Sequence, residues 1–334
     1  MMELLSYFIQ FAGERVVSIF WILFFYVFAK YIFCVVSSIF YKRDAVKDFK
    51  FFKSIVLFYI IIFAFFLLLG SALGTLETNV SATRISFFND YFIQMDKNIF
   101  GKYISFWMQD MHNPAKPFLD FLSPVIINTY RVIDILIGSI FLLFFFKNGK
   151  SLYKLAVSFA LTLVISIPLW ATFPALSPFD AYYINTMNVE APKGVQTAMS
   201  TYRPNENLAS VFDAVGKLDK KYTNFYAITT MPSMHIGWSV LIVYFGIVFW
   251  PPLAIFLIPY FLVNAVSTLY ILQHYAIDLP AGFAVGVISI WLAHKISERG
   301  VPRLIMELTT NVQEDFRGAT GFLWGFWYNR IMRQ

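Results

Sequence analysis

Residues 234–278 read MHIGWSVLIVYFGIVFWPPLAIFLIPYFLVNAVSTLYILQHYAID. The stretch contains two long apolar runs separated by two consecutive prolines, Pro251 and Pro252. Proline ends a helix and favours a tight connection, so the stretch predicts an antiparallel pair of helices near 235–250 and 253–273. Each run approaches the roughly 20 residues that a helix needs to cross the hydrocarbon core of a membrane. The pair therefore predicts a helical membrane protein.

The rest of the 334-residue chain has the same character. Only 14% of its residues are charged and 58% are hydrophobic, whereas soluble domains contain about 25% charged residues. This composition excludes a soluble globular domain, and it excludes intrinsic disorder, which requires low hydrophobicity. We therefore expect an all-α, polytopic bundle of about six to seven transmembrane helices. Five further segments are apolar enough to span, namely 16–40, 54–74, 122–146, 152–172 and 279–296.

The distribution of Lys and Arg predicts the side of the membrane that each loop faces. In a seven-span arrangement, segments 41–53, 147–154 and 294–334 lie on one side and hold 14 basic residues, whereas the longer segments of the other side hold 10. Short loops rich in Lys and Arg stay in the cytoplasm. We therefore expect an external N-terminus and a cytoplasmic C-terminus. The long segments 75–118 and 172–232 would then face the periplasm, a lumen or the cell exterior.

Two segments combine aromatic and polar residues in a way that is typical of a membrane surface. Segment 86–109 interleaves aromatic and charged residues too densely to span a bilayer. It predicts an interfacial amphipathic helix that serves as an anchor or as a wall guiding a lipid. Residues 321–328, GFLWGFWY, predict a second interfacial anchor, because Trp and Tyr favour the headgroup level.

Two of the four histidines occupy positions that a hairpin would bring together. His235 opens the first helix of the pair and His274 closes the second, so we expect both at the same external face. Asp278 follows His274 by four residues. If the helical turn continues there, its carboxylate lies on the same face and can accept the imidazole N–H. That bond would fix the tautomer and raise the basicity of the other ring nitrogen.

This arrangement suits attack on phosphorus. A histidine oriented by a carboxylate is a competent nucleophile, and a second histidine can protonate the leaving oxygen. Ser233 is expected to cap the helix beside it, where its hydroxyl and nearby backbone amides could hold phosphate oxygens. The scheme requires no metal and no cofactor. A single interfacial histidine is more often structural, but two histidines and a carboxylate on one face favour the chemical interpretation.

The residues around the histidines also resemble a known family. Pro232-Ser-Met-His235 and Ser267-x6-His274-x3-Asp278 look like the second and third signature motifs of the type 2 phosphatidic acid phosphatase superfamily. Members of this superfamily are membrane phosphatases and lipid phosphotransferases with several transmembrane helices.

The third motif is similar to one branch of that superfamily. Residues 268–282, TLYILQHYAIDLPAG, resemble the inositol phosphorylceramide synthase group, which moves a phospho-headgroup from one lipid to another. The resemblance implies that His274 is the nucleophile and forms a phosphohistidine-type intermediate. It also implies that Asp278 is the partner of His274, and that His235 acts first as general acid and then as general base.

The chain departs from the family pattern at the positions expected to bind phosphate. Thr268 stands where many phosphatases of the superfamily carry an arginine, and the Lys-x6-Arg-Pro motif is incomplete, because Gln196 stands seven residues before Arg203. Arg131 and Asp134, three residues apart inside an expected span, can pair with each other or bind substrate. The substrate-binding candidates are Ser233, Arg203, Lys193, Tyr270, Arg131 and Asp134, with Lys217, Lys220 and Lys221 as further cations.

These observations predict a membrane lipid phosphotransferase. It would move a phosphate or a phospho-headgroup, such as phosphoinositol, from a phospholipid to the hydroxyl of a lipid or sugar. Its partners would be membrane lipids and not nucleic acid, and the sequence leaves a homo-oligomer open. Two alternatives remain: a lipid phosphatase that uses water as acceptor, and a proton-coupled lipid transporter.

Residues 1–334 are expected to form one integral-membrane domain. Within it we expect N-terminal spans and an interfacial segment in 1–121. A catalytic helix bundle is expected in 122–296 and a cytoplasmic tail in 297–334. The chemistry would then take place at the external membrane face of a multi-pass protein.

Overall fold

The computed structural model describes residues 85–147, 149–185, 190–221, 230–303, 305–307 and 310, and this part of the chain is helical without strands. The chain divides into two compact units. The larger consists of Ala72–Ile137 and Val157–Leu292 and contains both histidine motifs, and the other consists of Met1–Ser71, Gly138–Ala156 and Ala293–Gln334. The expected spans 16–40 and 54–74 and the aromatic segment 321–328 lie outside the described residues.

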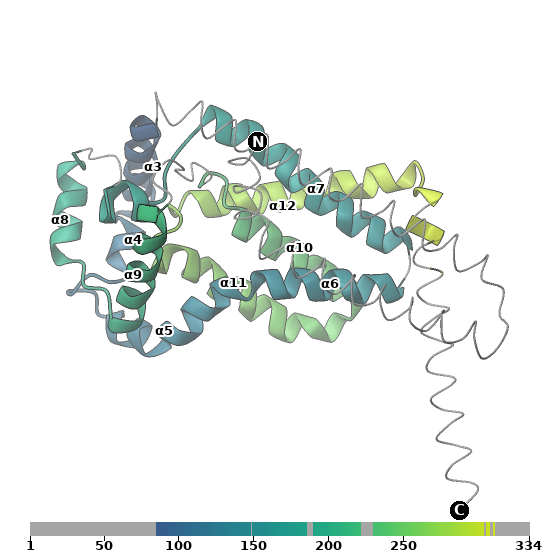
Figure 1. The fold of residues 1–334 in the computed structure, drawn as a ribbon, viewed down its shortest axis with the longest axis horizontal. Coiled ribbons are helices and arrows are strands. Elements are labelled where there is room, and N and C mark those ends of the chain that lie inside the picture. The colour runs from purple at the N-terminus through teal and green to yellow at the C-terminus, as the bar shows by residue number, and fades with distance from the viewer. Residues whose placement is uncertain are drawn as a thin grey trace, which may run out of the picture. The chain divides into compact units, whose positions relative to one another are not determined.

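The hairpin expected at the two prolines is present in the larger unit. Helix α10 (Met234–Phe249) leads into a 3-10 turn, η2 (Pro251–Leu253), and α11 (Ala254–Tyr270) returns beside α10 (Figure 1). Helix α12 (Asp278–Glu298) follows after the loop 271–277. Neither α10 nor α11 contains a charged residue of the Asp, Glu, Lys or Arg type.

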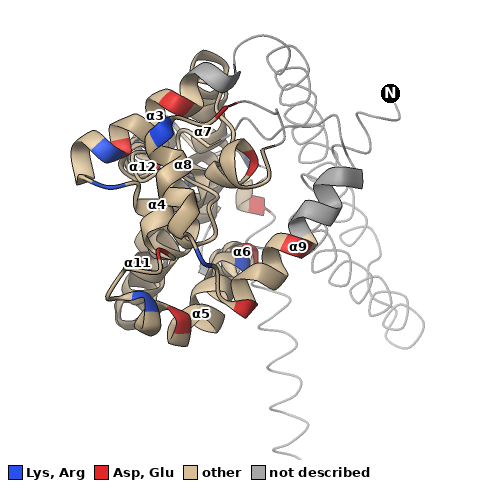
Figure 2. Cartoon of the chain, turned by 90° about the vertical axis from the view of Figure 1, so that its left-hand side faces the viewer, with Lys and Arg blue, Asp and Glu red and all other residues tan. Residues whose placement is uncertain are grey.

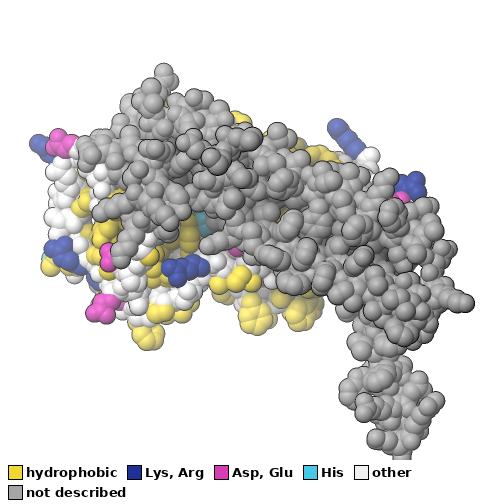
Figure 3. All heavy atoms as spheres, in the orientation of Figure 1, with side chains coloured by type: hydrophobic (Ala, Val, Ile, Leu, Met, Phe, Trp, Pro, Cys, Tyr) yellow, Lys and Arg dark blue, Asp and Glu magenta, His cyan; other side chains and the backbone are white. Residues whose placement is uncertain are grey.

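Three helices in the described part are long and apolar enough to cross a membrane: α7 (Gly149–Thr172), Pro251–Tyr270 and α12. A bent pair makes up to four, compared with the six to seven expected for the whole chain, and α10 is a shorter apolar helix. Large apolar side chains point outward from α11 and α12, including Ile255, Phe256 and Trp291, and hydrophobic side chains are visible on the described surface (Figure 3). These helices are suited to contact with lipid, which supports a membrane protein.

The span expected at 122–146 is divided into two helices, so the expectation of one continuous helix was wrong. Helix α5 (Lys116–Arg131) ends at Arg131, and α6 (Ile133–Lys147) begins after a bend of 44°. Arg131 lies in the last turn of α5 and Asp134 in the first turn of α6. A basic residue favours a helix C-terminus and an acidic residue a helix N-terminus, so both residues suit the helix ends at which they lie. Within the described part, no ion pair joins Arg131 to Asp134.

The segments between the apolar helices of the larger unit pack together into a cap. The cap contains α3 (Ile85–Phe100), α4 (Ile104–Trp107), a π-helix η1 (Phe179–Tyr183), α8 (Lys193–Thr201) and α9 (Glu206–Lys221), and Figure 1 shows α3, α4, α8 and α9 gathered at one end of α11. Its core is rich in aromatic side chains, among them Phe106, Phe179, Tyr202 and Phe212. The same core includes Tyr270 and Tyr275. The cap therefore packs against the end of α11 and against the loop that carries His274.

The charged residues of the larger unit are concentrated on this cap. Figure 2 faces the cap and shows acidic and basic residues of both signs spread over its helices. A mixed polar cap at the end of an apolar helix bundle is the arrangement expected when the bundle lies in lipid and the cap reaches water. The helix expected within 86–109 is present as α3, and its contact with a membrane surface stays a prediction.

Candidate active site

His274 lies in the loop 271–277. Leu272, with a left-handed φ of 57°, turns the chain out of α11. The carbonyl of Thr268, in the last turn of α11, accepts the N–H groups of Gln273 at 3.0 Å and His274 at 3.2 Å. From the cap, the Ser105 hydroxyl of α4 donates to the His274 carbonyl at 3.0 Å. The backbone of His274 is therefore held both by α11 and by the cap.

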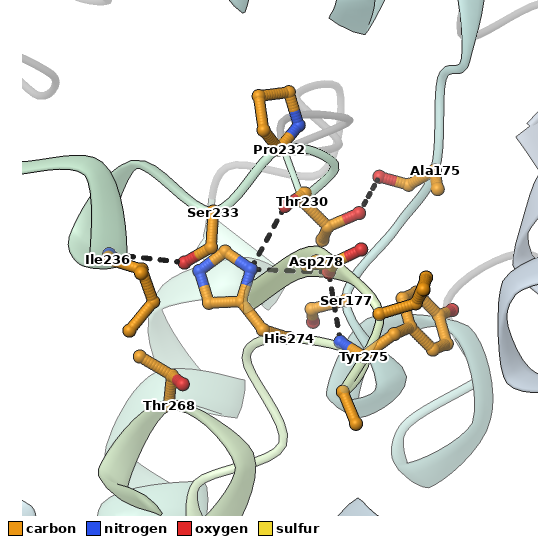
Figure 4. Close-up of polar contacts among 12 residues, drawn as sticks. Ala175, Ser177, Thr230, Pro232, Ser233, Ile236, Thr268, His274, Tyr275 and Asp278 are labelled. Atoms are coloured by element: carbon orange, nitrogen blue, oxygen red, sulfur yellow. Dashed lines mark hydrogen bonds and ion pairs between the residues drawn. The ribbon is translucent and has the colours of Figure 1, made fainter. Parts of the chain in front are cut away.

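The hydrogen bonds of the His274 ring define its tautomer. Its Nδ1 lies 3.0 Å from the carbonyl oxygen of Thr230 and 3.4 Å from Oδ2 of Asp278 (Figure 4). A carbonyl oxygen can only accept, so Nδ1 must carry the hydrogen. In a neutral imidazole the lone pair is then on Nε2. This is the form of histidine that can attack an electrophile.

Asp278 reaches His274 by a different route from the one expected. The helical turn does not continue from His274 to Asp278, because α11 has already ended and Asp278 is the first residue of α12. The carboxylate is fully buried, and its Oδ2 also accepts the N–H of Tyr275 at 2.9 Å. The loop thus folds back so that the spacing of four residues produces the expected contact without a helix.

His235 stands beside this pair, in the first turn of α10. The two imidazole rings have centroids 5.9 Å apart and planes inclined by 62°. Ser233 caps α10, as expected, since its hydroxyl accepts the N–H of Ile236 at a long 3.5 Å. The Ser233 N–H donates to the carbonyl of Asp278 at 3.2 Å. This bond ties the start of α10 to the start of α12 and so sets the spacing of the two histidines.

Two contacts of His235 were not evident from the sequence. The ring of Tyr130, in α5, stacks on the His235 ring with centroids 4.0 Å apart and an interplanar angle of 18°. Asn264 of α11 is fully buried, and its Nδ2 lies 3.4 Å from the His235 carbonyl and 2.8 Å from the Ser239 hydroxyl. Both contacts come from elements distant in the chain, and a single Tyr or Asn in an apolar run carries no signal for them.

The structure places several of the other candidates in contacts outside the histidine pair. Arg203 is exposed, and its Nη1 donates to the Tyr202 carbonyl at 2.8 Å. Lys193 and Arg131 are exposed at the start of α8 and the end of α5. Tyr270 is buried, and its hydroxyl accepts Nδ2 of Asn205 at 2.7 Å. The side chains of Lys217, Lys220 and Lys221 lie outside the described ones, and the described residues contain no His, Cys, Asp and Glu group suited to a metal.

A further carboxylate, missed by the sequence analysis, supports the same loop from the cap. Asp96 of α3 is fully buried and accepts the N–H groups of Ala276 at 2.7 Å and Ile277 at 2.9 Å. Burial raises the pKa of Asp96 to about 7, against the lowering effect of these two hydrogen bonds. In the sequence, Asp96 is one of several polar residues of an amphipathic segment, so nothing distinguished it.

Comparison with known protein families gives a match to the PAP2 superfamily over residues 91–292, which is more than half of the chain. The matched region begins within α3 and contains the rest of the cap, both histidines and Asp278. Neither the curated proteins nor the solved structures gave a match.

Proposed function

This chain belongs to the PAP2 superfamily, and from that premise we propose that it is a membrane lipid phosphotransferase. It moves a phosphate or phospho-headgroup from a phospholipid donor to the hydroxyl of a lipid or sugar acceptor. One observation carries the proposal: the Nδ1–H of His274 faces the Thr230 carbonyl and the Asp278 carboxylate, and the His235 ring lies 5.9 Å away. A nucleophile with a fixed tautomer and a second proton carrier are the two groups that phosphoryl transfer through histidine requires.

The proposed reaction has two steps. In the first, the lone pair of His274 Nε2 forms a bond to phosphorus, the bond from phosphorus to the leaving oxygen breaks, and protonated His235 gives its proton to that oxygen. The positive charge that develops on His274 is stabilised by Asp278. In the second step, His235 takes the proton of the acceptor hydroxyl, the acceptor oxygen bonds to phosphorus, and the phosphorus–nitrogen bond breaks. Both histidines return to their starting states.

Burial of the pair supports transfer to a lipid or sugar over transfer to water. His274 is 5% exposed, His235 is 8% exposed and Asp278 is fully buried, and limited access of water protects a reactive intermediate from hydrolysis. The likeness of residues 268–282 to inositol phosphorylceramide synthases supports phosphoinositol as the group and ceramide as an acceptor class. The bias of Lys and Arg supports a site at the external face and a cytoplasmic C-terminus.

The experiment that tests this proposal uses detergent-purified protein with EDTA. It is given a panel of phospholipids and lipid phosphates together with ceramide, inositol lipids and a polyprenol as acceptors, and the products are resolved by mass spectrometry. His274→Ala and His235→Ala are compared with His112→Ala, a matched control at an exposed position of the cap. We expect a new phosphodiester or phosphorylated acceptor from the wild type and from the control, and none from the other two variants.

Other outcomes of this experiment decide between the alternatives. Free phosphate or free headgroup without a transfer product would make the protein a lipid phosphatase. Equal product from the wild type, His274→Ala and His235→Ala would show that these histidines are not catalytic. Lipid movement across vesicles without any covalent product would favour the transporter.

A further inference from the structure

Two carboxylates in the described part of the chain are fully buried, Asp96 and Asp278. Both accept hydrogen bonds from the loop 271–277, although Asp96 precedes its partner Ala276 by 180 residues. An ionisable group is excluded from water only where donors compensate for the lost hydration. The two carboxylates therefore mark one place in the fold, the short connection between His274 and α12.

We propose that Asp96 is a positioning residue for the phosphotransfer reaction. Its two oxygens hold the consecutive N–H groups of Ala276 and Ile277, and so fix the peptide units that join His274 to Asp278. Asp96 touches neither the substrate nor the reacting atoms. It acts through the distance between the imidazole and the Asp278 carboxylate. The inference rests on the proposed function, because it concerns the same site.

The geometry of the contact explains why a carboxylate is needed at this position. Two adjacent N–H groups point at one side chain, and a carboxylate offers one oxygen to each, at 2.7 and 2.9 Å. Asparagine has one acceptor oxygen and would present an N–H₂ group to the second donor. Alanine would leave both N–H groups without this acceptor, and a buried donor without an acceptor is unfavourable. The loop would then be expected to move toward another acceptor.

Helix α3 is itself held firmly enough to serve as a support. The Oδ1 atom of Asn89 accepts the N–H of Leu176 at 2.7 Å, and Oδ1 of Asp90 accepts the hydroxyl of Tyr182 at 2.8 Å. Asp96 thus extends from a helix that is anchored to the segment 175–183 at its other end. Asp90→Asn provides a matched control, because the amide oxygen of asparagine can still accept the Tyr182 hydroxyl that anchors α3, and the residue does not contact the loop 271–277.

The test compares Asp96→Asn, Asp96→Ala and Asp90→Asn in purified full-length protein. Asparagine has nearly the same size as aspartate and keeps one acceptor oxygen, so Asp96→Asn should fold. A displacement of about 1 Å can lower kcat by about 100-fold. We expect about a tenfold loss of kcat for Asp96→Asn and about a 100-fold loss for Asp96→Ala, with KM within about twofold of wild type. Asp90→Asn should keep the wild-type kcat.

Hydrogen exchange of the amides of Ala276 and Ile277, measured by mass spectrometry, provides a readout that is independent of activity. We expect faster exchange in Asp96→Asn and wild-type exchange in Asp90→Asn. If the wild type transfers phosphate but Asp96→Asn has the wild-type kcat, the positioning role is overturned and the proposed function stands. If the wild type transfers nothing, the proposed function fails, and equal exchange in Asp96→Asn and wild type would overturn the positioning role as well.

Discussion

Gly282 of α12 lies against the backbone at the start of α10, where a methyl group has no room. A Cβ atom at this position would be 3.0 Å from the carbonyl carbon of Ser233 and 3.2 Å from Cβ of Ile236, and it would be closer still to the Ser233 carbonyl oxygen. Ordinary contacts of this kind are 3.4–4 Å long. The substitution Gly282→Ala therefore requires the two helices to separate by about 1 Å, because a packed backbone cannot rotate away as a side chain can.

This separation would act directly on the candidate active site. The Ser233 carbonyl is fixed by the N–H of Gly237 at 3.1 Å, and the Ser233 N–H is bonded to the Asp278 carbonyl at 3.2 Å. Moving α10 away from α12 therefore carries His235 away from Asp278 and from His274, which Asp278 contacts. Overpacking of this size destabilises a protein by about 1–3 kcal/mol. A misplacement of about 1 Å at reacting groups lowers kcat by about 100-fold.

The assay measures kcat for lipid transfer and the unfolding temperature of Gly282→Ala in detergent. The control is Ala284→Gly, at an exposed position of the same helix, which costs about 1 kcal/mol of helix propensity without touching α10. We expect a large loss of kcat for Gly282→Ala only. Wild-type kcat in Gly282→Ala would refute the reasoning. The same loss of kcat in both variants would show that lower stability, and not the spacing of α10 and α12, is responsible.

Two further predictions concern side chains that support the histidines. Because burial raises the pKa of Asp96 from 3.8 to about 7, its contribution to stability is fully present below pH 4 and is lost as the pH rises through about 7, a change of about 4 kcal/mol. Asp96→Asn should remove that part of the pH dependence when the free energy of unfolding is measured by denaturant titration at pH 4 and at pH 8. An equal change of this free energy between the two pH values in the variant and the wild type would contradict the prediction. Tyr130→Leu should lower kcat by about two- to tenfold, because an aromatic pair contributes about 0.5–1.5 kcal/mol. Tyr130→Phe should retain activity, and equal activity of the two variants would show that the stacking on His235 is without effect.

The parts of the fold that the sequence analysis predicted depend on local signals. Pro251 and Pro252 identify the turn of the hairpin, and with it the meeting of His235 and His274 at one end. The break near Arg131 was missed because a basic residue followed by an acidic one fits an ion pair within one helix as well as the end of one helix and the start of the next. Only the three-dimensional structure distinguishes these two arrangements.

The groups that orient the site could not be predicted in the same way. Thr230, which accepts the Nδ1–H of His274, contributes its backbone carbonyl, so its side-chain identity carries no information about the contact. Tyr130 and Asp96 come from α5 and α3, far from the histidines in the sequence. Their positions follow from the packing of the cap against α11, which no local pattern specifies. Resemblance to a family pointed to the candidate reacting residues but to none of these supports.

Helix α3 shows how a carboxylate can share the buried face of an amphipathic helix. Its outward side carries Tyr91, Ile99 and Phe100, each about half exposed, while Asn89 and Asp96 are buried against the loops of the site. Phe92 and Ile93, four and three residues before Asp96, are buried in the core on the same face of α3, so the helical period places Asp96 with them. An ionisable group on such a buried face is kept where hydrogen-bond donors compensate for its lost hydration. A carboxylate on the buried face of an amphipathic segment is therefore a candidate for the interior of the site, and Asp96, bonded to the two amides between His274 and Asp278, meets that description.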